Sequence, residues 1–403
     1  MDNLNDNNDN NKKIKICLNM IVKNESKVIL RCINSVSHLL DAVAIADTGS
    51  DDNTVNIIED FIKEKKFVGG VGKYRWKNFG HNRTESLKYA ESIIRDIPGI
   101  WYILFMDADD LVIGNDGSLN NLTLISLDKS KLDLNKCIYY INMKCGTLSY
   151  ERAWMVKYDP NRPWKWFHVL HEYIALENGS FTPNEVGKIS TGYIQATRDG
   201  ARSQDIVKYL RDAVTLEASL KEKALENSDA VPDAREIFYL AQSYRDSHIP
   251  HLLKNAEKIY LQRITLGGWP EEVYISYIES GKCRQMRNKN DFKTMELFMK
   301  AYELRPHRFE AIYHIVRWFR LHDMFKMGYT FGRPLINLPY PKDDRLFVND
   351  EIHTWRLYDE ISVCAFYAGD KKMCKLLSER ILKVDSVDSI NRERILKNIQ
   401  LSS

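Results

Sequence analysis

Apolar and polar positions over the first 110 residues follow two alternating periods. Residues 13–22 (KIKICLNMIV) and 42–47 (AVAIAD) predict buried strands, and each is followed by apolar residues at helical spacing, in 26–40 and 54–67. The same order returns in GKYRWKN (72–78), RTESLKYAESIIRD (83–96) and WYILFMDAD (101–109). Strands that alternate with helices predict a parallel sheet with crossover helices, and hence an α/β domain.

The pattern changes twice further along the chain. Residues 137–197 carry strand-like runs around a Trp- and Pro-bearing segment, which predicts a β-rich extension that completes the first domain. After Arg202 the apolar positions have helical spacing to the end. Similar helices begin at Arg235, Glu271, Phe309 and Thr354, which resembles a tetratricopeptide period of stacked helix pairs. We expect a tail at 1–12, an α/β domain at 13–203 and an all-α repeat domain at 204–403.

Composition narrows the class of protein and its partners. The 403 residues are 44% hydrophobic, enough for two cores, and the formal charge of +3 with interspersed signs favours neither nucleic acid nor a charged membrane surface. Seven scattered cysteines without a CxxC pair predict a reducing compartment, the cytoplasm. The polar first eleven residues lack the apolar core of a signal peptide, and no stretch of 18 apolar residues predicts a membrane span. We expect a tail there that is disordered.

The segment YILFMDADDLV (102–112) places three acids, Asp107, Asp109 and Asp110, at the end of a buried strand. Like charges so close raise each other's pKa unless a cation lies beside them. Hard oxygen ligands on a short loop suit Mg²⁺ or Mn²⁺ completed by substrate phosphates, so the pattern predicts a metal-bound nucleotide diphosphate. The alternative is that Asp109 and Asp110 only cap a helix or stabilise a turn. No GxxxxGK[ST] or strand-following GxGxxG supports other nucleotide folds.

Four segments in this order resemble the family two glycosyltransferases, which have the GT-A fold with its Rossmann-like, mostly parallel sheet. They are CLNMIVKNESKVILRCINSV, AIADTGSDDNT, FGHNRTESLKYA and FMDADD. The resemblance covers roughly residues 13–200, and FYLAQSY and LGGWPEEVY resemble the helical extension of one bacterial-type branch. It implies a GT-A catalytic domain followed by a tetratricopeptide-like extension.

The resemblance also implies roles for individual residues. Asp109 would bind the metal, and Asp107 would bind the ribose or donor sugar beside it. The nucleotide-sugar contacts would come from Met20, Val22, Asn24, Glu25, Asp47, Arg83, Asp107, Ala108 and Arg202. Two alternatives remain open: Asp47 as a plain helix-entry acid, and Arg83 as the ion-pair partner of Glu85 or Asp107.

An inverting transfer needs a general base to remove the proton of the acceptor hydroxyl. The candidate is Glu172, in WKWFHVLHEYI, with His171 beside it as in the branch resembled. His168 or His171 would help to hold phosphate or metal, and Trp164 and Trp166 would stack on sugars. The alternatives are a half-buried, hydrogen-bonded His171 and tryptophans that only pack.

The segment TRDGARSQD (197–205) is predicted to be either a linker or a mobile basic loop in which Arg202 closes over the diphosphate and excludes water. Relatives often have a histidine here as a further metal ligand, whereas this chain has Thr197. A third protein ligand is therefore in doubt.

These observations predict a metal-dependent inverting hexosyltransferase that moves a sugar from a nucleotide diphosphate, a UDP-sugar first, to a glycan or protein hydroxyl with Mn²⁺ or Mg²⁺. The alternative is a protein-binding helical-repeat scaffold with a vestigial GT-A domain. The repeats would present a protein acceptor, support the catalytic domain or form a homodimer. The sequence leaves the donor sugar and the acceptor open.

Overall fold

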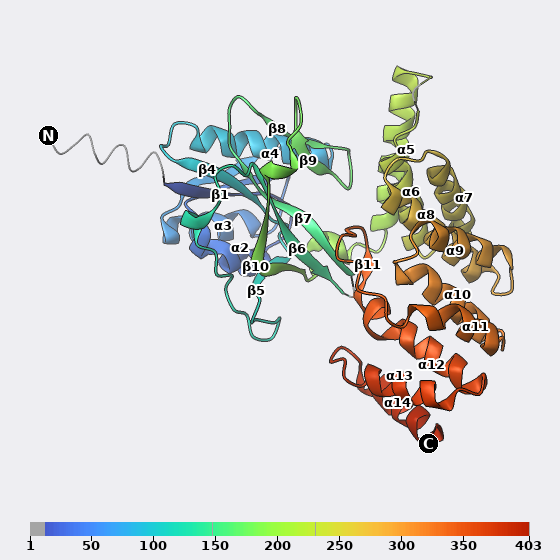
Figure 1. The fold of residues 1–403 in the computed structure, drawn as a ribbon. Helices are drawn as coiled ribbons and strands as arrows, with labels where there is room; N and C mark the ends of the chain where they lie inside the picture. Colours follow the sequence, from blue (N-terminus) through green and yellow to red (C-terminus); the bar gives the residue numbers. More distant parts are fainter. Residues whose placement is uncertain (1–12, 147, 230, 403) are drawn as a thin grey trace. The chain divides into compact units, whose positions relative to one another are not determined.

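The computed structural model describes residues 13–146, 148–229 and 231–402, so the predicted tail at 1–12 lies outside the described residues. Internal contacts divide the chain into two units. Of the described residues, the sheet unit comprises 13–146 and 150–219, and the helical unit comprises 148–149, 220–229 and 231–402. The predicted order, an α/β domain followed by an all-α region, is confirmed (Figure 1).

Four parallel strands form one half of the sheet, in the order β3-β2-β1-β4. Their bounds are β1 Ile14–Val22, β2 Ala42–Asp47, β3 Val68–Lys73 and β4 Ile100–Phe105. The strand predicted at 72–78 therefore lies earlier, because β3 holds three of its six positions as glycine, which hides its pattern. Residues 74–78 form the loop that leads to the next helix.

Alternate side chains of β1 enter opposite layers. Ile16, Leu18 and Met20 join one core with the helices α2 (Ile29–Val36) and α3 (Thr54–Lys65). Cys17 joins the other core, with α4 and the hairpin β8–β9. Figure 1 shows these helices on the two faces of the sheet. Burial on both faces explains why β1 and β2 are almost continuously apolar.

The remaining strands complete a mixed sheet, as the predicted β-rich extension requires. The order continues from β4 as β7-β6-β10-β5, with β7 antiparallel to β4, β10 parallel to β6 and β5 antiparallel to β10. A separate hairpin pairs β8 with β9. The bounds are α4 Phe79–Ile94, β5 Asp110–Gly114, β6 Ile138–Cys145, β7 Leu148–Lys157, β8 Trp164–Phe167, β9 Tyr173–Leu176 and β10 Val186–Ala196.

The division between the units falls inside a helix, later than the boundary predicted after residue 203. Helix α5 runs from Lys208 to Glu226, and contacts assign its residues to the sheet unit as far as Ser219. Ala213 and Leu216 are buried on this first part. A helical pattern marks where α5 begins, but it does not show which unit the helix packs against.

The helical unit is a chain of helices in which each packs against the next from α6 to α14. Figure 1 shows them in succession, coloured from yellow-green to red. The predicted starts at Arg235, Glu271 and Phe309 fall in α6, α8 and α10, and Thr354 falls in a π-helical turn that leads into α12. The bounds are α6 Ala234–Asp246, α7 Leu252–Thr265, α8 Pro270–Arg287, α9 Lys293–Leu304, α10 Phe309–Leu321, α11 Phe325–Gly332, the π turn Ile352–Arg356, α12 Leu357–Tyr367, α13 Lys371–Ile381, α14 Ser389–Leu401 and strand β11 Val348–Asn349. None of these helices, nor any other in the described ranges, is long and apolar enough to cross a membrane.

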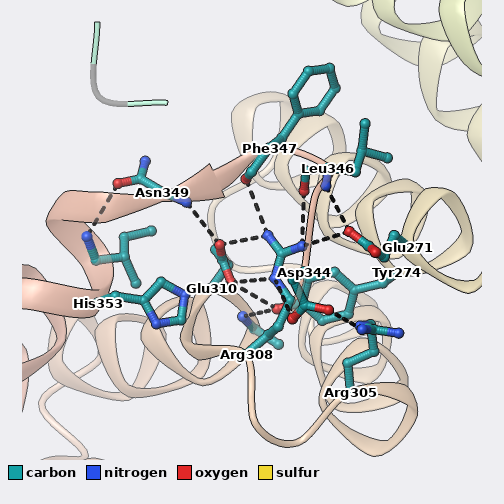
Figure 2. Close-up of polar contacts among 12 residues, drawn as sticks. Glu271, Tyr274, Arg305, Arg308, Glu310, Asp344, Leu346, Phe347, Asn349 and His353 are labelled. Atoms are coloured by element: carbon teal, nitrogen blue, oxygen red, sulfur yellow. Dashed lines mark hydrogen bonds and ion pairs between the residues drawn. The ribbon is translucent and has the colours of Figure 1, made fainter. Parts of the chain in front are cut away.

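A buried ion-pair cluster lies inside the helical unit, and we call it the Arg308 network (Figure 2). The Arg308 side chain is 0% exposed. Its guanidinium donates to both carboxylate oxygens of Glu310, at 3.0 and 2.7 Å, and to the carbonyls of Leu346 and Phe347, at 2.9 and 3.1 Å. These bonds fix the segment before β11 against α10.

Candidate functional site

The predicted site residues follow the carboxyl ends of three neighbouring parallel strands. Asn24 and Glu25 follow β1, Asp47 ends β2, and Asp107 and Asp109 follow β4. Because β1 lies between β2 and β4, these ends meet at one edge of the sheet. This edge is where open α/β sheets bind their ligands.

The first two loops at this edge are held by their own polar side chains. The buried carboxylate of Asp47 accepts hydrogen bonds from the amides of Gly49 and Ser50, at 3.1 to 3.2 Å. Asn24 has a left-handed φ of 58°, and its side-chain oxygen accepts from the Asp51 amide at 2.9 Å. These side chains therefore shape the loops, and their contacts to a nucleotide remain a prediction.

Three of the predicted nucleotide contacts have buried side chains. Met20, Val22 and Ala108 belong to the core between the sheet and α2–α3. The Val22 carbonyl accepts hydrogen bonds from the amide and hydroxyl of Thr48, at 2.9 and 3.0 Å. The side chains of these residues therefore belong to the core, and their contact with a nucleotide remains a prediction.

Arg83 joins two acids that lie far apart in the sequence. Its guanidinium lies on α4, donates to Asp107 and also donates to Glu172 at 2.5 Å. The Arg83 side chain is 8% exposed. Arg83 therefore pairs with Asp107, its contact with a sugar or diphosphate remains a prediction, and the candidate base Glu172 is fixed beside the strand-end acids. Among the described residues, no other hydrogen bond reaches the Glu172 carboxylate.

A close approach between α4 and the β8–β9 turn makes the contact between Arg83 and Glu172 possible. The Phe79 amide donates to the Val169 carbonyl at 3.1 Å. A Cβ at Gly80 would lie 2.1 Å from the His168 carbonyl oxygen, so only glycine fits there. His171, beside Glu172, has a φ of 53°. Such left-handed turns cost energy in non-glycine residues and are held by surrounding contacts.

Arg152 is a site residue that the sequence analysis did not identify. It lies on β7, and its Nη1 forms an ion pair with Asp107 at 2.8 Å and donates to Asp110 at 2.9 Å. Burial alone would raise the pKa of Asp107, but Arg152 and Arg83 outweigh it and hold that pKa well below its usual range. Asp110 is 2% exposed, and its burial, together with the charges of Asp107 and Asp109, raises its pKa to about 7 against the opposing effect of Arg152. The sequence did contain one indication of the role of Arg152, because a charged residue in the middle of a strand needs a partner when it is buried.

Asp109 is left with a different environment. Its carboxylate is half-buried and accepts one hydrogen bond in the described part of the chain, from the Gly200 amide at 3.2 Å. Glu25 accepts from the neighbouring Ala201 amide at 3.1 Å. A Cβ at Gly200 would lie 3.1 Å from atoms of both acids, so Glu25 and Asp109 meet around this glycine.

The two acids beside Gly200, Glu25 and Asp109, fit a divalent cation. Burial raises the pKa of Glu25 to about 7, and the charges of Asp109, Asp52 and Asp107 add to it while the Ala201 amide opposes it. Surplus negative charge on hard oxygen ligands is the donor set that Mg²⁺ and Mn²⁺ prefer, with one or two carboxylates and the rest of the shell left to water and phosphate. Asp109, with Glu25 beside it, fits that description.

The segment 197–205 contacts the site through its backbone. Thr197 donates to the Asp109 carbonyl at 2.6 Å, and the amides of Gly200 and Ala201 face the two acids. Arg202 donates instead to the buried Asp212 at 2.5 Å and lies over the Phe79 ring at 4.2 Å. The proposed closure of Arg202 over a diphosphate therefore remains a prediction.

The two tryptophans before Glu172 are packing residues, as the alternative interpretation held. Trp164 and Trp166 are buried in the core under α4. The Trp166 ring meets Phe105 edge-on at 5.0 Å and lies 5.2 Å from the Arg83 guanidinium. The Trp166 ring therefore packs against Arg83 and does not offer a face to a sugar.

Comparison with known proteins identifies the first part of the chain. Residues 17–116 match the family model for Glycosyl transferase family 2. The SPbeta prophage-derived glycosyltransferase SunS of Bacillus subtilis (strain 168) is 36% identical over 98 residues, and Glycosyltransferase SunS of Bacillus phage SPbeta gives the same figures. The match covers 24% of this chain and 20% of each relative, so the chain spans about a fifth of the length of the curated relatives it matches.

Solved structures give limited overlays. S. aureus TarS has a TM-score of 0.33 at 16% identity, over 73% of this chain and 55% of its own. TarS 1–349 in complex with UDP-GlcNAc has a TM-score of 0.29 at 16% identity, over 70% and 83%. MamA has a TM-score of 0.32 at 13% identity, over 45% and 94%. The family match instead covers β1 to β5 and the strand-end acids, and residues 17–116 therefore form a glycosyl transferase family 2 domain.

Proposed function

We propose that this chain is a metal-dependent, inverting glycosyltransferase, with a UDP-sugar as donor and a hydroxyl of a glycan or protein as acceptor. The family domain at residues 17–116 supports the class of reaction. The observation that carries the proposal is the contrast among the strand-end acids. Asp107 and Asp110 pair with arginines, whereas Asp109 has no cationic partner in the described residues.

The donor would lie over the carboxyl ends of β1, β2 and β4. Asp109, with Glu25, would hold a Mn²⁺ or Mg²⁺ ion, which supplies charge neutralisation for the diphosphate leaving group. Asp107 has its two oxygens oriented by Arg83 and Arg152 and a side chain that is 36% exposed. A fixed acceptor of this kind suits the hydroxyl groups of a ribose or sugar.

Glu172 is the proposed general base. Arg83 binds its Oε1, which orients the carboxylate and leaves Oε2 for the acceptor. As the acceptor oxygen attacks the anomeric carbon, its proton passes to Glu172 and the bond from that carbon to the diphosphate oxygen breaks. Attack from the face opposite the leaving group inverts the anomeric centre. His171 lies next to Glu172 in the same turn and is proposed to assist in binding.

Calorimetric titration of UDP into the purified full chain tests the proposal. We expect binding with Mn²⁺ that weakens roughly tenfold or more in EDTA, and a similar loss in Asp109→Ala, as is typical when a metal ligand is removed. Asp116→Ala is the matched control, because Asp116 is an exposed acid near the end of the same domain. We expect that variant to bind UDP as the parent does.

Two results would overturn the proposal. Undiminished Mn²⁺-dependent affinity in Asp109→Ala would place the nucleotide elsewhere. Failure of UDP, GDP and dTDP to bind, with or without metal, would favour the scaffold with a vestigial domain. In that case the helical unit would be the functional part of the molecule.

A further inference from the structure

Two of the three strand-end acids, Asp107 and Asp110, pair with arginines of the chain itself. Arg152 reaches Asp107 and Asp110 with a single nitrogen, Nη1, at 2.8 and 2.9 Å. Its side chain is 18% exposed, so these contacts are largely shielded from water. A shielded cation between two acids has a much stronger effect than a surface ion pair.

The position of Arg152 is set by the sheet. Its strand, β7, lies directly beside β4 in antiparallel register, with Leu104 opposite Met155. The acids follow the end of β4, so a residue three positions before Met155 on β7 extends past Leu104 toward them. Asp110 is fixed from a second side, because its Oδ2 also accepts from the Asp107 amide at 3.3 Å.

The two arginines divide the oxygens of Asp107 between them. Arg83 binds Oδ1 and Arg152 binds Oδ2. A carboxylate held in this way has a fixed plane and is not free to rotate toward a metal. It still offers lone pairs to hydroxyl donors on its exposed side.

We propose that Arg152 is a positioning residue of the donor site: it fixes Asp107 as a hydroxyl acceptor, pairs with Asp110, and so reserves Asp109 for the metal. This inference rests on the proposed function. It predicts that Arg152 opposes binding of a bare metal ion and favours binding of the nucleotide. A residue that only stabilises the fold would affect both in the same direction.

Two titrations of Arg152→Met test this. The first follows binding of Mn²⁺ alone by the loss of its free electron paramagnetic resonance signal. We expect roughly tenfold tighter Mn²⁺ binding, because a nearby positive charge is removed and Asp107 and Asp110 lose their partner. The second is calorimetry of UDP with saturating Mn²⁺, in which we expect roughly tenfold weaker binding because Asp107 is no longer fixed.

Two further variants sharpen the result. Arg152→Lys restores one charged nitrogen, and since both contacts come from one nitrogen, we expect Mn²⁺ affinity to return to within about twofold of the parent. Lys188→Met is the matched control. Lys188 is 62% exposed and pairs with Glu151, which lies next to Arg152 on β7. We expect it to change neither titration.

The outcomes separate this inference from the proposed function. A parent chain that fails to bind UDP would refute the proposed function, and the inference with it. A parent that binds UDP, with Arg152→Met unchanged in both titrations, would refute only the inference. Weakening of Mn²⁺ and UDP together, or an unfolded Arg152→Met whose Arg152→Lys counterpart binds Mn²⁺ more weakly than the parent, would also refute it.

Discussion

The strand-end site and the Arg308 network are both built from buried arginines and acids, but they differ in whether every acid has a cationic partner. In the Arg308 network, Glu310 accepts from Arg308, from the Asn349 amide at 3.0 Å and from the Tyr274 hydroxyl at 3.3 Å. At the strand ends, Arg83 and Arg152 satisfy Asp107 and Asp110, while Asp109 has a single amide donor in the described residues.

This difference teaches how to separate a structural cluster from a functional one. Buried charges are tolerated when partners and additional hydrogen bonds satisfy them. Arg308 meets that condition while fixing the segment before β11. An acid left without a cation, at an edge where parallel strands end, points to a missing partner. The predictions below test this contrast, beginning with the largest effect.

Arg308→Met breaks the satisfied network and removes the arginine partner of Glu310, which keeps only the weaker contact with His353 Nε2 at 3.3 Å among the ion pairs of the described residues. We expect the free energy of unfolding to fall by about 3–5 kcal/mol, because an unpaired buried charge is costly. Urea unfolding followed by circular dichroism measures this. Glu393→Gln breaks an exposed ion pair with Lys397 and is the control, with an expected change below about 0.5 kcal/mol. A loss below about 1 kcal/mol in Arg308→Met would contradict the structural role.

Glu172→Gln tests the strand-end site by removing the proposed general base. We expect donor turnover to fall about a hundredfold or more, because a general base is lost. UDP affinity with Mn²⁺ should stay within about threefold, because the amide keeps the shape of the side chain. Radiometric donor hydrolysis and calorimetry measure the two quantities. An equal loss of both would mean that Glu172 acts through Arg83 on the donor site, and not as the base.

His314 gives a smaller, pH-dependent effect within the helical unit. Burial, with a further contribution from Lys282, lowers the pKa of His314 to about 3, and its ring stacks on Phe298 at 4.8 Å. The unfolded chain takes up this proton below about pH 6.5 and the folded chain does not. The stability that neutral His314 contributes is therefore complete above pH 6.5 and is lost as pH falls from 6.5 toward 3.

We expect the loss from His314 to reach about 1–2 kcal/mol at pH 5. His314→Gln removes this titration, so its deficit in unfolding free energy relative to the parent should be smaller at pH 5 than at pH 7. Urea unfolding at both pH values measures the two deficits. Equal deficits would show that His314 takes up its proton alike in the folded and unfolded chains.

Much of the fold follows from local patterns. The strands at 14–22 and 42–47 and the repeated helices were predictable, because each has a strong apolar period. The third strand was misplaced because Gly69, Gly70 and Gly72 carry no apolar side chain. The end of the sheet unit within α5 was not predictable, because it depends on contacts between distant segments.

The site residues also divide into those predictable from local pattern and those that depend on contacts between distant segments. The acids at the ends of β1, β2 and β4 were identified because alternating strands and helices predict a parallel sheet, and such sheets bind ligands beyond the carboxyl ends of their strands. Arg152 was not, because its contact with Asp107 depends on β7 lying beside β4, which no local pattern specifies. The pairing of Arg83 with Glu172 likewise required the approach of Gly80 to the turn at 168–172.

The central claim is most directly tested by comparing Asp109→Asn with Glu310→Gln in two assays, UDP titration with Mn²⁺ and urea unfolding. We predict that Asp109→Asn loses roughly tenfold or more in UDP affinity and changes the unfolding free energy by less than about 0.5 kcal/mol. Glu310→Gln should lose about 2–3 kcal/mol and bind UDP as the parent does while it is folded. Retained Mn²⁺-dependent UDP affinity in Asp109→Asn would contradict the account.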